Sequence, residues 1–192
     1  MKDVCIYCAS STNIDKKYIE VADKLAEVLV RNNYGIVYGG GEVGLMGAIA
    51  DRVLSMNGRI TGIIPRFMVE VEWAHKGVEN MVQVETMAER KTRLIQDVSA
   101  VIALPGSTGT LDELIDVLSL KKLGKFTKPV IIVNSFGFYD SLIALFDKMI
   151  EERFMRPEHR DLWSVIEEPE DIVMAIDNAP EWDENAIKIA AV

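Results

Sequence analysis

Two glycine-rich stretches carry residue types that bind anions. Residues 39–47 read GGGEVGLMG, and residues 105–113 read PGSTGTLDE. Glycine lets the backbone come close to a ligand, and the free N–H groups at the start of a helix attract negative charge. The hydroxyls of Ser107, Thr108 and Thr110 add hydrogen-bond donors. We therefore expect the two stretches to flank one phosphate monoester.

A carboxylate and two cations could add chemistry to this anion site. Glu113 ends the second stretch, where it either serves the reaction or closes a capping box begun by Thr110. Arg90 and Lys91 follow Thr86 and the first turn of another expected helix. They form either part of a solvated charged face, or a cationic pair that meets a phosphate or keeps Glu113 ionised.

Other ligands fit the sequence less well. Gly39, Gly41 and Gly44 match G-x-G-x-x-G, a spacing that close packing of a strand on a helix also explains. NAD is disfavoured, because the next strand ends in Pro65 and Arg66 instead of an acidic residue. A P-loop is excluded, because no G-K-[ST] closes the glycine run.

The cysteines and histidines predict neither redox chemistry nor a metal. Cys5 and Cys8 form C-x-x-C within a strand, where residues three apart point to opposite faces. His75 and His159 lie far apart in the sequence, and no H-E-x-x-H motif is present. We expect no metal and no cofactor.

The apolar pattern predicts an α/β fold. Helical spacing of apolar residues spans 18–29 and 45–54. Short apolar runs without polar alternation predict seven strands at 4–8, 35–38, 59–64, 81–84, 100–104, 130–133 and 163–166. The expected architecture is a single-domain, Rossmann-like, doubly wound parallel sheet with helices on both faces. Ligands bind such sheets beyond the carboxyl ends of the strands, where both glycine stretches lie.

Length and charge narrow the class further. We expect one catalytic, nucleotide-binding domain at 1–179 and a loosely held C-terminal tail at 180–192. The net charge of −9 argues against nucleic-acid and anionic membrane partners. No apolar run reaches the roughly 18 residues of a membrane span, and no signal-peptide pattern is present, so we expect the cytoplasm.

Several motifs, in order, resemble one family. Residues 105–113 are similar to the P-G-G-x-G-T-x-x-E signature of the LOG ("lonely guy") family of cytokinin-nucleotide phosphoribohydrolases, many of which were once labelled lysine decarboxylases. YCASS at 7–11, YGGG at 38–41 with GLMG at 44–47, and MAERK at 87–91 resemble further family segments. The likeness runs from the N-terminus past FYD at 138–140.

The resemblance implies a homodimer with its active site close to the dimer interface. The implied reaction hydrolyses the N-glycosidic bond of a purine (cytokinin-type) riboside 5'-monophosphate to free base and ribose 5-phosphate. Arg90 and Glu113 would be the catalytic pair, and Met87 and the segment around Trp73 would contact the base. The residues implied for phosphate and ribose are Gly106, Ser107, Thr108, Gly109 and Thr110, with Gly39, Gly40, Gly41, Ser10 and Lys91 assisting or nearby.

Two departures from the family pattern bear on this expectation. Ser107 replaces the second glycine of the signature, and Ala9 replaces a glycine common after the first strand. A side chain at Ser107 disfavours a positive φ and would narrow the phosphate turn, although its hydroxyl adds a donor. The alternative function is a carrier or sensor that binds a nucleotide or cofactor without catalysis. The preferred purine base is left open.

Overall fold

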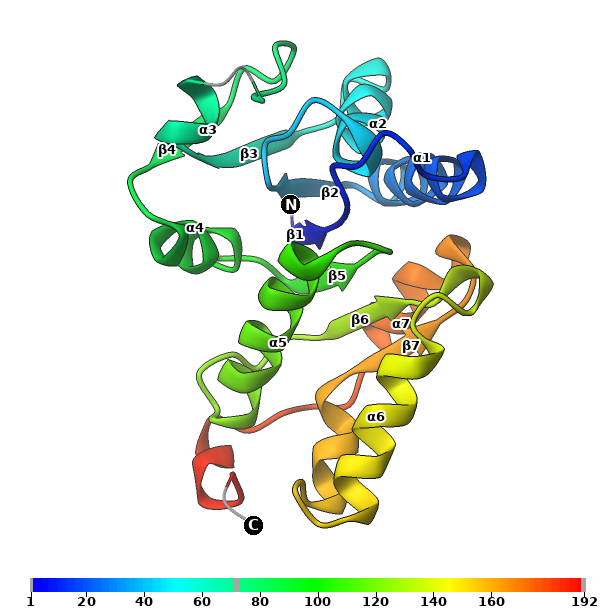
Figure 1. The fold of residues 1–192 in the computed structure, drawn as a ribbon, viewed down its shortest axis with the longest axis vertical. Helices are drawn as coiled ribbons and strands as arrows, with labels where there is room; N and C mark the ends of the chain where they lie inside the picture. The colour runs from blue at the N-terminus through cyan, green and yellow to red at the C-terminus, as the bar shows by residue number, and fades with distance from the viewer. Residues whose placement is uncertain (1, 71–72, 191–192) are drawn as a thin grey trace.

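A parallel sheet forms the centre of the molecule (Figure 1). The computed structural model describes residues 2–70 and 73–190. Its seven strands lie in the order β4-β3-β2-β1-β5-β6-β7, and every strand pair is parallel. The strands are β1 (Lys2–Tyr7), β2 (Tyr34–Tyr38), β3 (Ile60–Pro65), β4 (Met81–Val84), β5 (Ala100–Ala103), β6 (Val130–Val133) and β7 (Ser164–Ile166). All seven predicted strands are confirmed.

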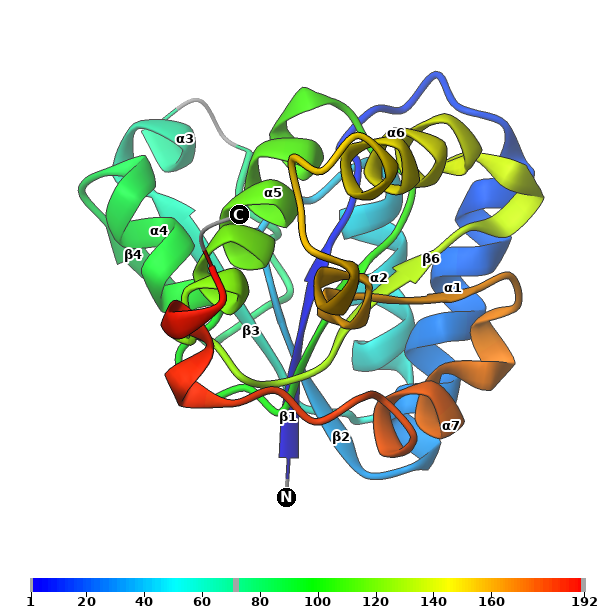
Figure 2. The same cartoon turned by 90° about the horizontal axis from the view of Figure 1, so that it is seen from below.

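Helices cover both faces of the sheet, as the unbroken apolar strands predict. The α-helices are α1 (Lys16–Arg31), α2 (Gly44–Ser55), α3 (Arg66–Glu70), α4 (Met87–Leu94), α5 (Thr108–Lys122), α6 (Asp140–Glu151) and α7 (Ile172–Asp177). Short 3-10 helices are η1 (Ser135–Gly137), η2 (Pro157–Leu162), η3 (Pro169–Asp171) and η4 (Glu184–Lys188). Figures 1 and 2 show α1 and α2 on the opposite side of the sheet from α4 and α5.

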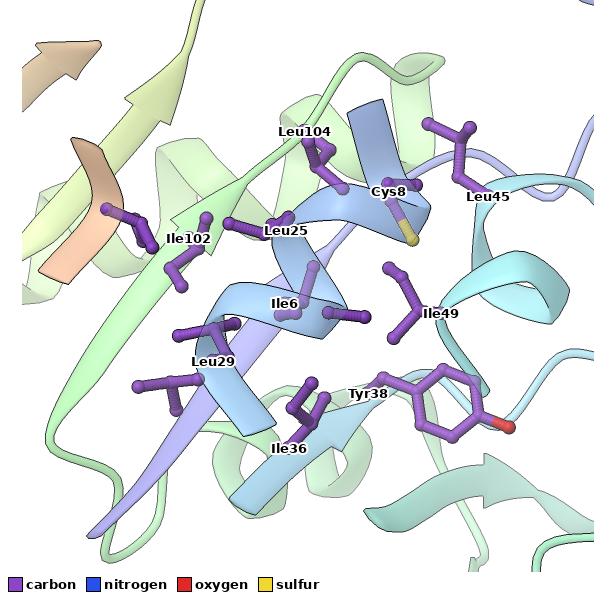
Figure 3. Packing of buried hydrophobic residues seen from close by; sticks show 14 of the residues in the cluster. Ile6, Cys8, Leu25, Leu29, Ile36, Tyr38, Leu45, Ile49, Ile102 and Leu104 are labelled. Carbon is purple, nitrogen blue, oxygen red and sulfur yellow. The ribbon is translucent and has the colours of Figure 1, made fainter. Parts of the chain in front are cut away.

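The alternation of side chains along β1 divides the core into two parts. Ile6 and Cys8 pack with α1 and α2, as Figure 3 shows, whereas Cys5 and Tyr7 pack on the side of α5. The two cysteines therefore lie on opposite faces of the sheet, as predicted. Both are buried free thiols.

The strand order reverses beside β1, since β2 pairs with one of its edges and β5 with the other. The chain leaves β1 and β5 in opposite directions at their carboxyl ends, which opens a crevice there. Loop contacts join this edge: Ala9 donates its N–H to the carbonyl of Pro105, and Leu45 donates to the carbonyl of Ala9. Both glycine stretches meet at this edge, as expected.

The C-terminal segment packs against α5. Trp182 donates its indole N–H to the carbonyl of Lys121 at 2.6 Å, and Ala186 in η4 is buried. The expectation that the tail is loosely held is therefore wrong, because Trp182 and Ala186 give it an apolar anchor. The division of the chain at residue 179 stays a prediction. Within the described ranges, no helix is long and apolar enough to cross a membrane.

Candidate functional site

A cavity of about 590 Å³ lies at the carboxyl edge of the sheet. Its walls come from the loops after β1 and β2, from the end of β3, from α2, α3 and α4, and from the start of α5. The lining residues are Cys8, Ser10, Ser11, Thr12, Gly39, Gly41, Glu42, Val43, Met46, Ile64, Met68, Trp73, Met87, Arg90, Ser107, Gly109, Thr110, Asp112 and Glu113. This volume lies within the range of small-molecule sites.

An ion pair between Arg90 and Glu113 forms part of the cavity wall. Nη1 of Arg90 donates to Oε1 of Glu113 at 2.8 Å, and the two side chains are only 7% and 6% exposed. Nε of Arg90 donates to the carbonyl of Ile63 at 3.1 Å, and Nη2 donates to that of Gly39 at 3.4 Å. A solvated charged face is therefore wrong for Arg90, because its position on α4 turns it inward.

The starts of α4 and α5 bring this pair together. Thr86 caps α4, with its hydroxyl accepting from the N–H of Glu89 at 3.1 Å, so Arg90 lies one turn into the helix. Helix α5 begins at Thr108, with Ser107 as its N-cap. The capping box of Thr110 and Glu113 is therefore wrong, because α5 starts before Thr110 and places Glu113 in its second turn.

The surroundings of Glu113 make its carboxyl more basic. Burial raises its pKa above the ordinary value of 4.5, and the negative Asp112 adds to this effect. The Arg90 cation lowers the pKa, as does Lys91, but burial is the largest cause and the net direction is upward. A carboxylate of raised pKa is a stronger proton acceptor than an ordinary glutamate, which suits a general base.

The start of α5 carries backbone donors that are free to bind an anion. Ser107 makes no side-chain cap bond. Within the part of the chain that the structure describes, no residue accepts from the backbone N–H of Thr108, Gly109 or Thr110. Unpaired N–H groups at a helix start attract anions. Gly109, Thr110 and Ser107 line the cavity, so these donors border the same space as Glu113.

The residues of this turn have different structural roles. A Cβ at Gly109 would meet nothing within 4 Å, so this glycine leaves room for a ligand. A Cβ at Gly106 would lie 2.0 Å from Oγ1 of Thr110, so Gly106 makes room for that buried side chain. Ser107 has φ −93° and ψ −164°. Its extended backbone needs no glycine, and the departure from the signature causes no strain.

The helix that follows the other glycine stretch has fewer free donors than predicted. The N–H groups of Leu45 and Met46, in the first turn of α2, both donate to the carbonyl of Ala9. The expectation that these two N–H groups are free is wrong, because the loop after β1 supplies their acceptor. Gly39 and Gly41 still line the cavity.

Nine of the residues implied by the family resemblance lie together around the cavity. They are Ser10, Gly39, Gly41, Met87, Arg90, Ser107, Gly109, Thr110 and Glu113. Gly40, Gly106, Thr108 and Lys91 are not among the lining residues. Nζ of Lys91 lies 3.3 Å from Asp112 and 3.4 Å from Asp116, so the lysine joins α4 to α5 outside the cavity.

The sequence analysis missed an apolar wall formed by Met46, Met68, Ile64 and Val43. Helix-spaced apolar residues are typical of a core, so no sequence signal set these apart. Cys8 was also missed as a lining residue. Burial raises the pKa of its thiol, so the sulfur stays protonated.

The segment around Trp73 completes this wall. Glu42 donates its N–H to the carbonyl of Trp73 at 3.1 Å, and His75 donates its N–H to that of Gly40 at 2.9 Å. Trp73 is 58% exposed yet lines the cavity, so a planar apolar ligand would cover it. The cavity thus combines free backbone N–H donors, a buried carboxylate and an apolar wall.

Comparison with known sequences identifies relatives over most of the chain. The family model "Possible lysine decarboxylase" matches residues 46–176. Cytokinin riboside 5'-monophosphate phosphoribohydrolase LOG2 of Arabidopsis thaliana is 37% identical over 178 residues, which are 93% of this chain and 79% of that protein. Cytokinin riboside 5'-monophosphate phosphoribohydrolase LOG7 of Arabidopsis thaliana is 34% identical, over 98% of this chain and 87% of that protein.

Solved structures share the fold at low sequence identity. The molybdenum cofactor carrier protein MCP from Chlamydomonas reinhardtii aligns with a TM-score of 0.70 and 13% identity, over 93% of this chain and 98% of that one. The molybdenum cofactor binding protein from Rippkaea orientalis aligns with a TM-score of 0.70 and 18% identity, over 92% of this chain and 96% of that one. At these identities the likeness concerns the fold alone. The family model and the curated relatives, by contrast, cover most of the chain, and on that ground the chain belongs to the LOG family.

Proposed function

We propose that this protein hydrolyses the N-glycosidic bond of a purine, cytokinin-type, riboside 5'-monophosphate. The observation that carries the proposal is the buried Arg90–Glu113 pair on the same cavity as the free N-terminus of α5. Relatives at 34–38% identity are named cytokinin riboside 5'-monophosphate phosphoribohydrolases, which supports the substrate class. The products would be free base and ribose 5-phosphate.

The 5'-phosphate would bind at the start of α5. The unpaired N–H groups of Thr108, Gly109 and Thr110, together with the hydroxyl of Ser107, provide donors and the positive end of the helix dipole. Ser10 borders the same space from the loop after β1, and we assign it to the ribose or phosphate. Gly106 makes room for Thr110, and Lys91 joins α4 to α5 from outside the cavity.

Glu113 would act on the reacting centre. Breaking the bond between C1′ and N9 builds positive charge on the ribose, and a fixed carboxylate stabilises that charge. The same carboxylate orients the attacking water and accepts its proton as the new C1′–O bond forms. The electron pair of the C1′–N9 bond leaves with the base, which takes up a proton to become the free base. Arg90, bonded to Glu113, Ile63 and Gly39, holds the carboxylate in place.

The base would lie against the apolar wall. Met46, Met68, Trp73 and Met87 surround this part of the cavity and offer aromatic and thioether surface to a flat ring. Thioethers adapt to irregular apolar shapes, which suits a base with an apolar substituent.

Decarboxylation of an amino acid through a Schiff base lacks its key residue here. Such chemistry needs a lysine at the site. Within the described ranges no lysine lines the cavity, and Lys91 is paired with Asp112 and Asp116. The hydrolytic reaction needs only Glu113, Arg90 and the phosphate turn.

We expect the protein to act in the cytoplasm as a homodimer, with the outer face of α5 at or near the contact. Leu111, Ile115 and Ser119 line a shallow groove there, Ile115 is 41% exposed, and Asp112 borders both groove and cavity. Sedimentation equilibrium should give twice the 21.5 kDa mass of one chain. Ile115→Glu should shift the protein toward monomer, and a wild-type mass of one chain would contradict the expectation.

Glu113→Gln should abolish turnover and keep nucleotide binding. Loss of a positioned acid–base group lowers kcat by roughly 10²–10⁴-fold. Free base is measured chromatographically after incubation with AMP and with isopentenyladenosine 5'-monophosphate, and binding is measured by calorimetry. Glu89→Gln on α4 is the matched control. Base release by Glu113→Gln at the wild-type rate would refute the role of Glu113, and wild-type binding without base release would favour a carrier.

As the pH is lowered, kcat should begin to fall at a pH above 4.5, the ordinary pKa of a glutamate. Because burial raises the pKa of Glu113, the ionised carboxylate is lost as the pH falls through that raised value. The profile is measured as kcat at saturating nucleotide, so that titration of the free nucleotide's phosphate does not enter. A rate that stays constant down to pH 4.5 would contradict the assignment.

Gly109→Ala should weaken substrate binding without destabilising the protein. The added methyl meets no protein atom within 4 Å, and alanine is the better helix former by about 0.5–1 kcal/mol, but the methyl enters the space left for the phosphate. KM should rise about tenfold or more, with an unchanged or higher melting temperature. An unchanged KM would place the phosphate elsewhere.

A further inference from the structure

The glycine turn after β2 presents carbonyl groups to its neighbours. The carbonyl of Gly39 accepts from Nη2 of Arg90, and that of Gly40 accepts from the N–H of His75. Carbonyl oxygens carry partial negative charge and do not attract a phosphate. In the helix that follows, the N–H groups of Leu45 and Met46 already donate to Ala9. The carbonyl of Gly39 thus serves a cation of the protein itself.

The missing side chain of Gly39 makes room for the guanidinium of Arg90. A Cβ at this position would lie 2.2 Å from Nη2 of Arg90, a distance that real Cβ atoms do not show. The next neighbour is Cε of Met46 at 3.1 Å, the mobile end of a flexible side chain. Cβ atoms at Gly40 and Gly41 would instead meet Met81 and Met46 first. Gly39 is thus the member of the turn that contacts the ion pair.

The guanidinium is held on three sides. Nε bonds to the carbonyl of Ile63, Nη1 to Glu113 and Nη2 to the carbonyl of Gly39. A displaced guanidinium would lose these acceptors inside a buried site, where an unpaired charge is costly. The ends of β2 and β3 thereby fix the distance between Arg90 and Glu113.

We propose that Gly39 is a positioning residue for the hydrolysis: its carbonyl and its lack of a side chain hold the Arg90 guanidinium against Glu113. The effect on rate rests on the proposed function. The effect on the geometry of Arg90 does not, and it has its own measurement below.

Gly39→Ala should lower kcat about 10²-fold, the usual cost of misplacing a catalytic group by about 1 Å. KM should change less than about threefold, because the phosphate site on α5 is untouched. Displacement of the cation should also move the acid limb of kcat to higher pH, because Arg90 no longer lowers the pKa of Glu113.

The same substitution in an Arg90→Ala background should have no further effect beyond about twofold, because Gly39 acts through Arg90. Gly77→Ala adds a methyl group in an exposed turn and is the control for the effect of a glycine-to-alanine change away from Arg90. A raised KM with normal kcat would instead indicate contact with the nucleotide. An equal loss of rate with and without Arg90 would indicate a packing defect. Either result would overturn the proposal.

A measurement on the wild-type protein tests whether the Arg90 guanidinium is held in place, even if Gly39→Ala fails to fold or no base is released. The Arg90 Nε–H, assigned by its loss in Arg90→Lys, should exchange slowly with water in ¹⁵N NMR spectra, because it is buried and bonded to Ile63. Fast exchange would overturn the proposal. Slow exchange in a protein without hydrolase activity would refute the proposed function but would still agree with the proposed position of the Arg90 guanidinium.

Discussion

The burial of one ion pair governs how this site is built. Taking Arg90 and Glu113 out of water costs several kcal/mol per ion, and their mutual attraction offsets that cost only with good geometry and further hydrogen bonds. The carbonyls of Ile63 and Gly39 supply these bonds to the cation. Among the described residues, the Glu113 side chain accepts one hydrogen bond, from Arg90, and burial raises its pKa. The carbonyl groups of the site thus fix the Arg90 cation, while the Glu113 carboxylate stays available for the reaction.

The parallel sheet makes this arrangement possible. Strands of one direction end at one edge, so carbonyls from β2 and β3 come within reach of a side chain on α4, and α5 begins beside them. The reversal of strand order at β1 separates the loops and leaves the cavity between them. The start of α5 offers free backbone N–H groups, whereas in the first turn of α2 those of Leu45 and Met46 already donate to the loop after β1.

Local patterns were sufficient for much of the molecule. The strands follow from short apolar runs, and the opposite facing of Cys5 and Cys8 follows from the two-residue period of a strand. The motifs also led to the family and to most of the residues around the cavity. They failed for the start of α2 and for the tail, because the acceptor at Ala9 and the anchor of Trp182 on α5 are contacts between distant segments.

The sequence did not reveal the role of each glycine or of the charged pair. A glycine looks the same in a motif whether it leaves space for a ligand, as Gly109 does, or for another side chain, as Gly39 and Gly106 do. The sequence by itself determined the sheet, the family and which loops meet at the carboxyl edge, because these depend on periodicity and on neighbours in the chain. Only the tertiary structure decided that Arg90 turns inward to Glu113, because that choice depends on carbonyls from two other strand ends.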